Sequence, residues 1–456
     1  MSSQAFSKNE GGGIVIYKEE LLNMVKYDVK AVLVSPLAIK DDNDELRVDQ
    51  LTGGVYIPGS SIAGAFRNYY ESYVNKNSDE NINELFGGRK SGMGKVVFYD
   101  AHLADESTQG TVSSRPGLKI DNSRQTEAKS GDIKESGTKF SRKFMEKGMA
   151  FRFVFELNNY GEEGFEKKQK ELENLIKAFS VGDISLGGNK MIGYGRFKVE
   201  SVFKEEYNFT NADDLLRFML RNPKSKDVTK YILSGDYSTL KVRFKVKAKT
   251  ATPLLIRDEV IRSSDEPDGI NIKDGNDFII PGSSLKGVIR SRAQRLQKTF
   301  PCIGEDIISN IFGIEAGGDN SQISRLKCFD TVIRDCKKRV YNKIKIDHFT
   351  GGTMQGALSE DEVIMGKLDI ECTLDTAGLK DYKKEVGLLL LVLRDLCVGD
   401  LCMGSGYAVG WGYMKAETLE LFDGENIVFG FGTDDKEALG KFDLYISKLM
   451  EAGCKQ

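Results

Sequence analysis

The sequence predicts an α+β protein made of two ferredoxin-like domains in tandem, each with the element order βαββαβ. The first observation is a repeated motif: "YIPGSSIAGAFR" at residues 56–67 returns as "FIIPGSSLKGVIR" at residues 278–290. Pro58 and Pro281 are 223 residues apart, close to half of the 456-residue chain, and this indicates two copies of one fold. The second observation is that strand-like and helix-like hydrophobic patterns follow each other in the same order in both halves.

Further landmarks repeat in the same order. "ELFGG" near Phe86 corresponds to "NIFGI" near Phe312, and "LKID" ending at Asp121 corresponds to "IKID" ending at Asp347. The longest echo pairs "VGDISLGGNKMIGYGRFKV" with "VGDLCMGSGYAVGWGYMKA", which begins at Val398. Collinear echoes of this kind indicate a duplicated domain.

Each half contains the same six elements. Alternating polar and apolar residues indicate strands, and apolar residues at helical spacing indicate amphipathic helices. In the first half we expect a strand at 27–39, a helix at 60–74, strands at 94–103 and 149–157, a helix at 165–180 and a strand at 192–202. In the second half we expect a strand at 240–256, a helix at 284–296, strands at 325–333 and 366–374, a helix at 381–396 and a strand at 409–421.

Breaker-rich sequence separates the two halves. A short helix at 212–220 runs into "RNPKSKDV" and "SGDYS", which places the boundary near Gly235. The predicted domains are a flexible leader at 1–26, a first domain at 27–235 and a second domain at 236–456. Long polar insertions at about 109–147 and 339–365 fall between the second and third strands of each domain, and loops of that length are typically functional or disordered.

Composition excludes several classes. The longest apolar run, "VGLLLLVL" at 386–393, is shorter than the ~20 residues of a membrane span. The polar start of the chain lacks the apolar segment of a secretory signal, so we expect a cytoplasmic protein. An amphipathic segment near the C-terminus, "KEALGKFDLYISKLMEAG", is expected to pack on the core.

The cysteines argue against a disulfide framework. There are seven, all in the second half, without paired spacing. A zinc site can be drawn from Cys302, Cys328, Cys336 and His348, but the gaps match no common zinc finger. We therefore expect reduced thiols and keep structural zinc as an unfavoured alternative.

Charge is concentrated locally. The net charge is −3, so the protein as a whole is not a polycation that binds every nucleic acid by charge alone. Residues 323–347 nevertheless hold eight basic and three acidic side chains, and residues 113–147 hold nine basic and five acidic ones. A single charge run is usually a solvated loop. The recurrence at matching places favours a functional surface.

The repeated PGSS motif stands where a strand passes into a helix. Its hydroxyls can cap the first helical N–H groups, and the positive end of the helix dipole can hold a phosphate. A cap and turn without a ligand is the alternative. The candidate phosphate contacts here are Ser60, Ser61 and Arg67 in the first copy and Ser283, Ser284, Lys286 and Arg290 in the second.

The glycine-rich runs before the last strand of each half are a second candidate surface. Missing side chains let a polyanion approach the backbone closely, although glycines near a strand often only relieve crowding. The candidate residues are Gly188 and Lys190 in the first copy and Gly404 and Gly406 in the second. Trp411, the only tryptophan, is expected in the core.

An acidic loop precedes each PGSS motif: "IKDDNDELRVDQ" and "RSSDEPDGINIKDGND". Acidic loops are usually solvated turns. A carboxylate beside a scissile phosphate can instead hold Mg²⁺, which stabilises the developing charge. The sequence shows no P-loop, HExxH or GxSxG motif, and its two histidines, His102 and His348, cannot supply a paired-histidine site in each half.

The motifs together resemble the RAMP proteins of CRISPR systems, and within them the backbone subunits (Cas seven group) of type III effector complexes. The resemblance is carried by "IPGSSLKGVIR", the "FG" that follows, "KIDHFTGG" from Lys345, "GALSEDEVIMG" and the closing glycine-rich loop. It covers both halves, so the chain resembles a fusion of two such subunits.

This resemblance implies a function. Backbone subunits stack along a guide RNA, each inserts a β-hairpin thumb that kinks the guide–target duplex, and a loop aspartate with Mg²⁺ (or Mn²⁺) supports cleavage of the target RNA beside each kink. Carried over by position, the aspartates are Asp268 in the second copy and Asp44 in the first, with Asp42 in reserve, and Asp268 and Asp44 are also the expected metal ligands. The thumbs fall at about 119–139 and 345–363, with Lys119, Lys345, His348 and Thr350 as RNA contacts.

The implied partners are a crRNA guide, a single-stranded target RNA and other effector subunits, with no membrane. Two alternatives stay open. Either copy, or both, can be a non-catalytic crRNA-binding scaffold in which the acidic loops are turns. A guide-processing endonuclease of the same superfamily is a weaker alternative, because such enzymes usually rely on histidine.

Overall fold

A computed structural model describes most of the chain. The described residues are 6–8, 14–16, 20–41, 45–49, 53–74, 79–88, 92–105, 111–118, 120–121, 126–127, 139–161, 164–234, 241–258, 266–314, 321–354, 358–432 and 435–451. By its internal contacts the chain forms two units. The first comprises Met1–Thr111, Met145–Gly188 and Gly195–Tyr237, and the second comprises Val112–Phe144, Asn189–Tyr194 and Ser238–Gln456.

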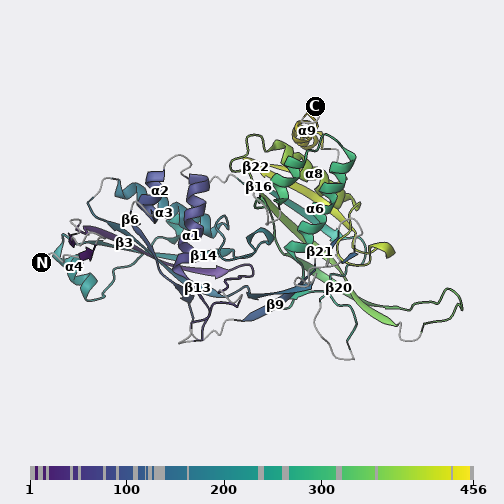
Figure 1. Ribbon diagram of the computed structural model, residues 1–456, viewed down its shortest axis with the longest axis horizontal. Coiled ribbons are helices and arrows are strands. Elements are labelled where there is room, and N and C mark those ends of the chain that lie inside the picture. The colour runs from purple at the N-terminus through teal and green to yellow at the C-terminus, as the bar shows by residue number, and fades with distance from the viewer. Residues whose placement is uncertain are drawn as a thin grey trace. The chain divides into compact units, whose positions relative to one another are not determined.

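The first unit is built on a seven-stranded antiparallel sheet with the order β15-β14-β3-β13-β8-β4, in which β7 also pairs with β13 (Figure 1). Its strands are β3 (Asn23–Leu33), β4 (Tyr56–Ile57), β7 (Val96–Phe98), β8 (Ala101–Leu103), β13 (Ala150–Asn159), β14 (Phe197–Asn208) and β15 (Lys226–Asp227). Its helices are α1 (Gly59–Tyr69), continued by a π-helical turn at Tyr70–Val74, α2 (Asp79–Phe86), α3 (Phe165–Ser180), α4 (Ala212–Met219) and α5 (Thr229–Ser234).

Period-two burial along the strands builds the core of this unit. Along β13, Phe151, Phe153 and Phe155 are all fully buried, while Arg152 between them is exposed. The alternation follows from the pleat of a strand, which sends successive side chains to opposite faces. Phe66 of α1 and Phe179 of α3 pack against these rings, so the two predicted helices cover one face of the sheet.

The second unit repeats this plan with eight strands in the order β17-β18-β20-β21-β16-β22-β23, and β19 also pairs with β21. Its strands are β16 (Lys241–Thr250), β17 (Lys273–Asp274), β18 (Asp277–Ile280), β19 (Leu326–Cys328), β20 (Thr331–Lys343), β21 (Ser359–Asp375), β22 (Met414–Asp423) and β23 (Glu425–Gly430). Its helices are α6 (Gly282–Thr299), α7 (Glu305–Phe312), α8 (Lys383–Val398) and α9 (Lys436–Glu451).

Short strand pairs complete the described structure. They are β1 (Phe6–Lys8) with β2 (Ile14–Ile16), β5 (Gly87–Gly88) with β6 (Gly92–Met93), β9 (Val112–Leu118) with β12 (Lys139–Met145), and β10 (Ile120–Asp121) with β11 (Thr126–Glu127). Strands β9 and β12 form the base of the first insertion. In the predicted second insertion β20 and β21 pair from Ile333 to Lys343 as one long hairpin, with a bulge between Arg334 and Lys337 (Figure 1).

The predicted α+β class and the repeat are confirmed. In each unit the first strand of the repeat lies between the last strand and the third strand: β14-β3-β13 in the first and β22-β16-β21 in the second. The predicted strands at 94–103 and 325–333 are each divided in two, at Tyr99–Asp100 and at Phe329–Asp330. The division has a cause, because each aspartate turns out of its strand to the first amide of the following helix motif.

Some elements were not expected. Helices α2 and α7 occupy the "LFG" and "IFG" echoes, and β23 adds an edge strand to the second sheet. The expectation for the C-terminal segment is confirmed: Phe442, Tyr445 and Leu449 of α9 are buried in the core of the second unit. Trp411 is also buried, with 8% of its surface exposed. None of the described helices is long and apolar enough to cross a bilayer.

Candidate nucleic-acid interface

The PGSS motifs form helix N-termini in both units, but their serines do not cap them. Pro58 and Pro281 are the N-cap residues, and neither makes a side-chain cap hydrogen bond. The Gly59 N–H donates instead to Asp100 Oδ1 at 2.7 Å, and the Gly282 N–H donates to Asp330 Oδ1 at 2.8 Å. The prediction of serine caps was therefore wrong. A carboxylate from a neighbouring strand already satisfies the first amide and faces the positive end of the helix dipole.

Close packing explains the glycine of this motif. A Cβ atom on Gly59 would lie 2.2 Å from the carbonyl oxygen of Phe98, and one on Gly282 would lie 2.4 Å from that of Cys328. The helix start thus lies directly on the strand that carries the capping aspartate. Ser60 is exposed, and the structure places Ser61, Ser283 and Ser284 at partly exposed positions on the first helical turn.

The basic residues of these helices have different environments. Arg67 donates to Glu71 Oε1 at 2.7 Å, to the Gly87 carbonyl at 2.7 Å and to Asn83 Oδ1 at 3.1 Å. These bonds tie α1 to the segment around α2, so Arg67 has a structural role. Arg290 is exposed on α6, and its contact with a phosphate stays a prediction.

Lys286 is partly buried, and groups of the second unit hold its ammonium. Its Nζ donates to Ser324 Oγ at 2.7 Å and to the Leu326 carbonyl at 2.8 Å. Burial lowers the pKa of Lys286 from 10.5 to about 8, because the charged form loses hydration. We therefore leave Lys286 out of the proposed RNA surface.

This lysine makes stability depend on pH in a defined direction. Between about pH 8 and 10.5 the unfolded chain holds the Lys286 proton and the folded chain does not, so the free energy of unfolding rises with pH across that window. We expect the rise in wild type to exceed that in Lys286→Met by on the order of a few kcal/mol. Urea denaturation followed by the fluorescence of Trp411, the only tryptophan, measures it. Identical pH slopes for the two proteins would contradict the assignment.

The glycine-rich loops fold back on the segment that follows the first strand of each repeat. Gly188 N–H donates to the Ala38 carbonyl at 2.7 Å, and Ser405 N–H donates to the Leu255 carbonyl at 2.8 Å. A 3₁₀ turn follows in both loops, at Lys190–Ile192 and at Tyr407–Val409.

The exposure of these loops differs between the predicted residues. Gly188 and Gly404 are exposed, whereas Gly406 is partly covered by the Trp411 ring. Lys190 is partly buried, and burial lowers its pKa. Tyr407 and Val409 extend into solvent, so the loop of the second unit presents an open surface beside Gly404.

The hairpin of β20 and β21 carries the positive charge predicted for the second insertion. Its exposed cations are Arg334, Lys337, Lys338, Arg339, Lys345 and Lys367. Three of them pair with carboxylates of the same hairpin: Arg334 with Asp369, Lys338 with Glu362 and Lys367 with Asp335. At the hairpin end the motif "IDHFTGG" forms a tight turn. Asp347 Oδ1 accepts from the Phe349 and Thr350 amides at 2.8 and 2.9 Å, which lowers the pKa of Asp347. The Asp347 N–H in turn donates to the Gly352 carbonyl at 2.9 Å.

This turn exposes aromatic and basic side chains together. Phe349 is 100% exposed, and His348 and Thr350 beside it are also exposed. Exposing a phenylalanine ring to water is unfavourable in free energy. The exposed ring also provides a face on which a base can stack. Phe349 was missed at the sequence level, although its place inside the "KIDHFTGG" motif was the available signal.

A buried aspartate organises the base of the hairpin. Asp361 is fully buried, and it pairs with Arg257 at 2.8 Å and with Lys343 at 2.6 Å. Lys343 Nζ also lies 4.0 Å from the centroid of the Trp411 ring. Both cations remain partly exposed, so two fixed positive groups face solvent at this point. Sequence reasoning missed Asp361 and Arg257 because their partners are far apart in the chain.

Asp268 lies next to this cluster. It is exposed, and its Oδ2 accepts the Glu360 N–H at 2.9 Å. The next residue, Gly269, bridges to Asp361, and a Cβ there would lie 2.2 Å from Asp361 Oδ1. The structure thus brings the predicted aspartate of the second copy to the base of the hairpin, beside Arg257 and Lys343. The first-copy candidates Asp42, Asp44 and Lys119 lie outside the described residues.

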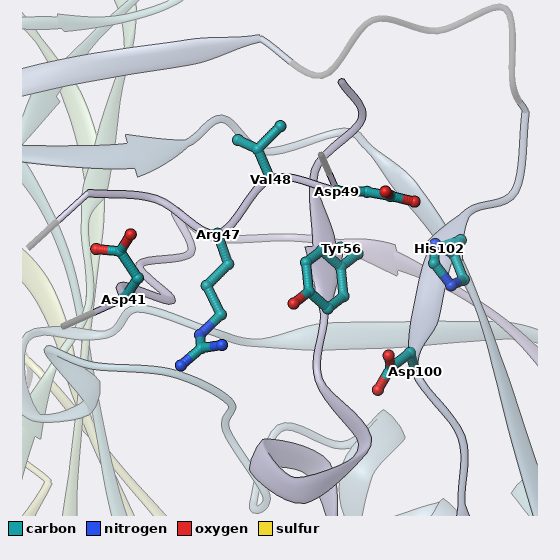
Figure 2. Close-up of a pocket in the computed structure, with 7 residues that line it drawn as sticks. All are labelled: Asp41, Arg47, Val48, Asp49, Tyr56, Asp100 and His102. Carbon is teal, nitrogen blue, oxygen red and sulfur yellow. The ribbon is translucent and has the colours of Figure 1, made fainter. Parts of the chain in front are cut away.

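The acidic loop of the first unit lines a pocket of about 410 Å³ (Figure 2). Its lining is Asp41, Arg47, Val48, Asp49, Tyr56, Asp100 and His102. The rings of Tyr56 and His102 are stacked, with 6.0 Å between centroids. Three carboxylates against one guanidinium give the pocket an acidic character.

The cysteines of the zinc hypothesis are dispersed. Cys328 is buried with its Sγ 3.6 Å from that of Cys372, and Cys302 Sγ lies 3.6 Å from Met450 Sδ. The described part of the chain contains no group of three His, Cys, Asp or Glu side chains arranged to hold a metal ion.

Comparison with known proteins identifies the family. The family model of the RAMP superfamily matches residues 30–198 and again residues 247–415, one match in each repeat. The chain belongs to the RAMP superfamily. A comparison with curated proteins found no match. A chain in the cryo-EM structure of the type III-B Cmr-β complex bound to cognate target RNA is 18% identical, with a TM-score of 0.31 over 40% of this chain and 60% of that chain.

Proposed function

We propose that this RAMP protein is a fused, RNA-binding backbone subunit of a type III CRISPR effector complex. Two family regions in one chain, each in a unit with the strand order of a ferredoxin-like sheet, support two tandem backbone modules. The observation that carries the proposal is the hairpin of β20 and β21. It joins a run of exposed cations that includes Lys337, Arg339 and Lys345 to an exposed aromatic tip at Phe349.

The charge distribution favours a nucleic acid held by its backbone. Cations on the hairpin contact phosphates, and the net charge of −3 keeps the rest of the chain from non-specific binding. Phe349 offers a stacking face that does not depend on base identity. Sequence choice then comes from pairing between guide RNA and target RNA, as in other RNA-guided systems.

We further propose that the second unit cleaves target RNA with Mg²⁺ (or Mn²⁺) at Asp268. One carboxylate held by a backbone amide suits Mg²⁺, which takes few protein ligands and completes its shell with water and substrate phosphate. When bound, the metal stabilises charge on the phosphate and lowers the pKa of an attacking hydroxyl. The Glu360 amide orients the Asp268 carboxylate, while Arg257 and Lys343, fixed by Asp361, hold the flanking phosphates.

The test uses the protein assembled with guide RNA and a labelled complementary target. We expect Asp268→Asn to reduce cleavage by the second unit at least ~100-fold, since a metal contact contributes several kcal/mol. Target binding is expected to stay within about twofold. Glu266→Gln, in the same loop, is the matched control and is expected to cleave normally. Adding Asp44→Ala tests the first unit, and EDTA tests the metal in wild type.

A non-catalytic scaffold is the second candidate. It is favoured by one observation: the described residues gather no three metal-ligating side chains. This candidate predicts guide and target binding without Mg²⁺-dependent fragments. Unchanged fragments in the Asp44→Ala, Asp268→Ala double variant would instead show that other residues cut.

A further inference from the structure

Two cysteines of the second unit face each other across β19 and β21. Cys328 and Cys372 are directly opposite in the register of these antiparallel strands. The Cys372 thiol donates to Cys328 Sγ at 3.6 Å, and both side chains are fully buried. Neither sulfur is in a disulfide. The structure thus holds two free thiols in contact inside the core of one unit.

The strand pairing gives the two cysteines the backbone separation that a disulfide needs. The Phe329 N–H donates to the Glu371 carbonyl at 3.2 Å. This bond joins the residue after Cys328 to the residue before Cys372, and it marks the cysteines as a non-hydrogen-bonded pair of the ladder. The Cα atoms of such a pair are about 4.5 Å apart. Disulfides bridge Cα atoms about 4.4–6.8 Å apart, so a bond can form here without a shift of either strand.

This pair lies at the base of the β20–β21 hairpin. Between Cys328 and Cys372 the chain runs out along β20, turns at the exposed tip with Phe349 and returns along β21. Two residues after Cys328, Asp330 accepts the Gly282 N–H at the start of α6. A covalent link would therefore hold the base of the hairpin closed while the hydrogen bonds between β19 and β21 open and close.

The surroundings keep the two thiols protonated in the absence of an oxidant. Contact with Cys328 and burial raise the pKa of Cys372. The nearby Lys286 ammonium acts in the opposite direction, because a positive charge favours the thiolate. The thiolate is the reactive form and is a minor species here. Oxidation is therefore expected on sustained exposure to a small oxidant that reaches the pair when β19 opens locally.

We propose that Cys328 and Cys372 are a site of reversible oxidation, at which a peroxide produces a disulfide across β19 and β21. One thiolate attacks the O–O bond of hydrogen peroxide, which gives a sulfenic acid and a hydroxide that takes up the thiol proton to become water. The second thiol then displaces the sulfenic oxygen, so that an S–S bond forms, an S–O bond breaks and a second water leaves. Two sulfur atoms together lose two electrons, and one peroxide is reduced to two waters. The inference goes beyond RNA binding and holds whether or not the chain binds or cuts RNA.

Disulfide mapping tests the inference on the full chain. The protein is reduced, freed of reductant and treated with hydrogen peroxide while folded. It is then unfolded, alkylated and digested without reduction, and linked peptides are identified by mass spectrometry. We expect the link between Cys328 and Cys372 to be the main intrachain product and to disappear after treatment with dithiothreitol. Two thiols that both remain free for alkylation, or a main link to any other cysteine, would overturn the proposal.

The effect on stability shows whether the link forms in the folded unit without distorting it. The link spans 44 positions and restricts the unfolded chain, so the urea midpoint of the second unit is expected to rise by about 1–2 M. Trp411 fluorescence reports this midpoint. Cys372→Ala, treated with peroxide in the same way, is expected to show no rise. Cys397→Ala, which removes another buried thiol, is the matched control and is expected to rise as wild type does. A linked wild type whose midpoint stays or falls would contradict a native cross-strand disulfide.

Discussion

Replacing Arg115 by alanine is expected to destabilise the second unit by about 3–5 kcal/mol, because two carboxylates then lose the cation between them. Asp274 is itself buried, with 5% of its surface exposed, and Asp330 is largely covered. Neither can regain full hydration without disturbing β18 or the start of α6. Denaturant unfolding read by Trp411 fluorescence reports this loss, because Trp411 belongs to the same unit.

Two further variants separate charge from packing. Arg142→Ala removes an arginine of the same insertion that stacks on Phe140, and it is expected to cost below about 1 kcal/mol. In an Asp274→Asn, Asp330→Asn background, Arg115→Met is expected to cost much less than the same change in wild type, since no uncompensated carboxylate remains. Equal costs in both backgrounds would show that the arginine stabilises by packing alone.

Replacing Gly412 by alanine is expected to destabilise the second unit by about 3–5 kcal/mol. Gly412 has a φ of +84°, a left-handed conformation that costs an L-residue about 1–2 kcal/mol. A Cβ there would also lie 2.0 Å from the Met403 carbonyl oxygen. The Met403 N–H also donates to the Gly412 carbonyl at 2.9 Å. Met403 therefore cannot move away from a new Cβ without breaking this hydrogen bond.

Gly410 provides the control for the Gly412→Ala prediction. Its φ of +82° is almost the same, but nothing lies within 4 Å of its virtual Cβ. Gly410→Ala is therefore expected to cost only the backbone contribution, about 1–2 kcal/mol. Urea midpoints measured by Trp411 fluorescence compare the two variants. Similar midpoints would mean that the contact with Met403 relaxes freely and that conformation alone selects glycine.

The hypothesis for the PGSS motif shows the limit of local reasoning. A serine pair at a strand-to-helix junction predicts a cap, and the junction itself was predicted correctly. The cap comes instead from Asp100 and Asp330. They accept hydrogen bonds from the amides of Gly59 and Gly282, which are 41 and 48 positions away in the sequence. Local preference cannot reveal such a partner, because only the sheet brings the two segments together.

The candidate site shows the same division. The acidic loops and the charged insertions were identifiable from the sequence, since they recur at fixed places in both halves, and the family resemblance singled out Asp268. Asp361, Arg257 and Trp411 meet only through sheet pairing, and burial of an aspartate between two cations leaves no sequence pattern. Phe349 lay within a motif already singled out, yet its exposure is a property of the turn that Asp347 closes.

The sequence by itself determined the duplication, the α+β class and the order of strands and helices, because periodicity and repeated motifs are local along the chain. The tertiary structure alone decided that Lys286 and Arg67 bond to groups of their own units, that Asp100 and Asp330 cap the helices, and that Arg115 lies between Asp274 and Asp330. These outcomes depend on hydrogen bonds and desolvation between residues distant in sequence. Such terms are set only when the strands pair and the side chains are buried.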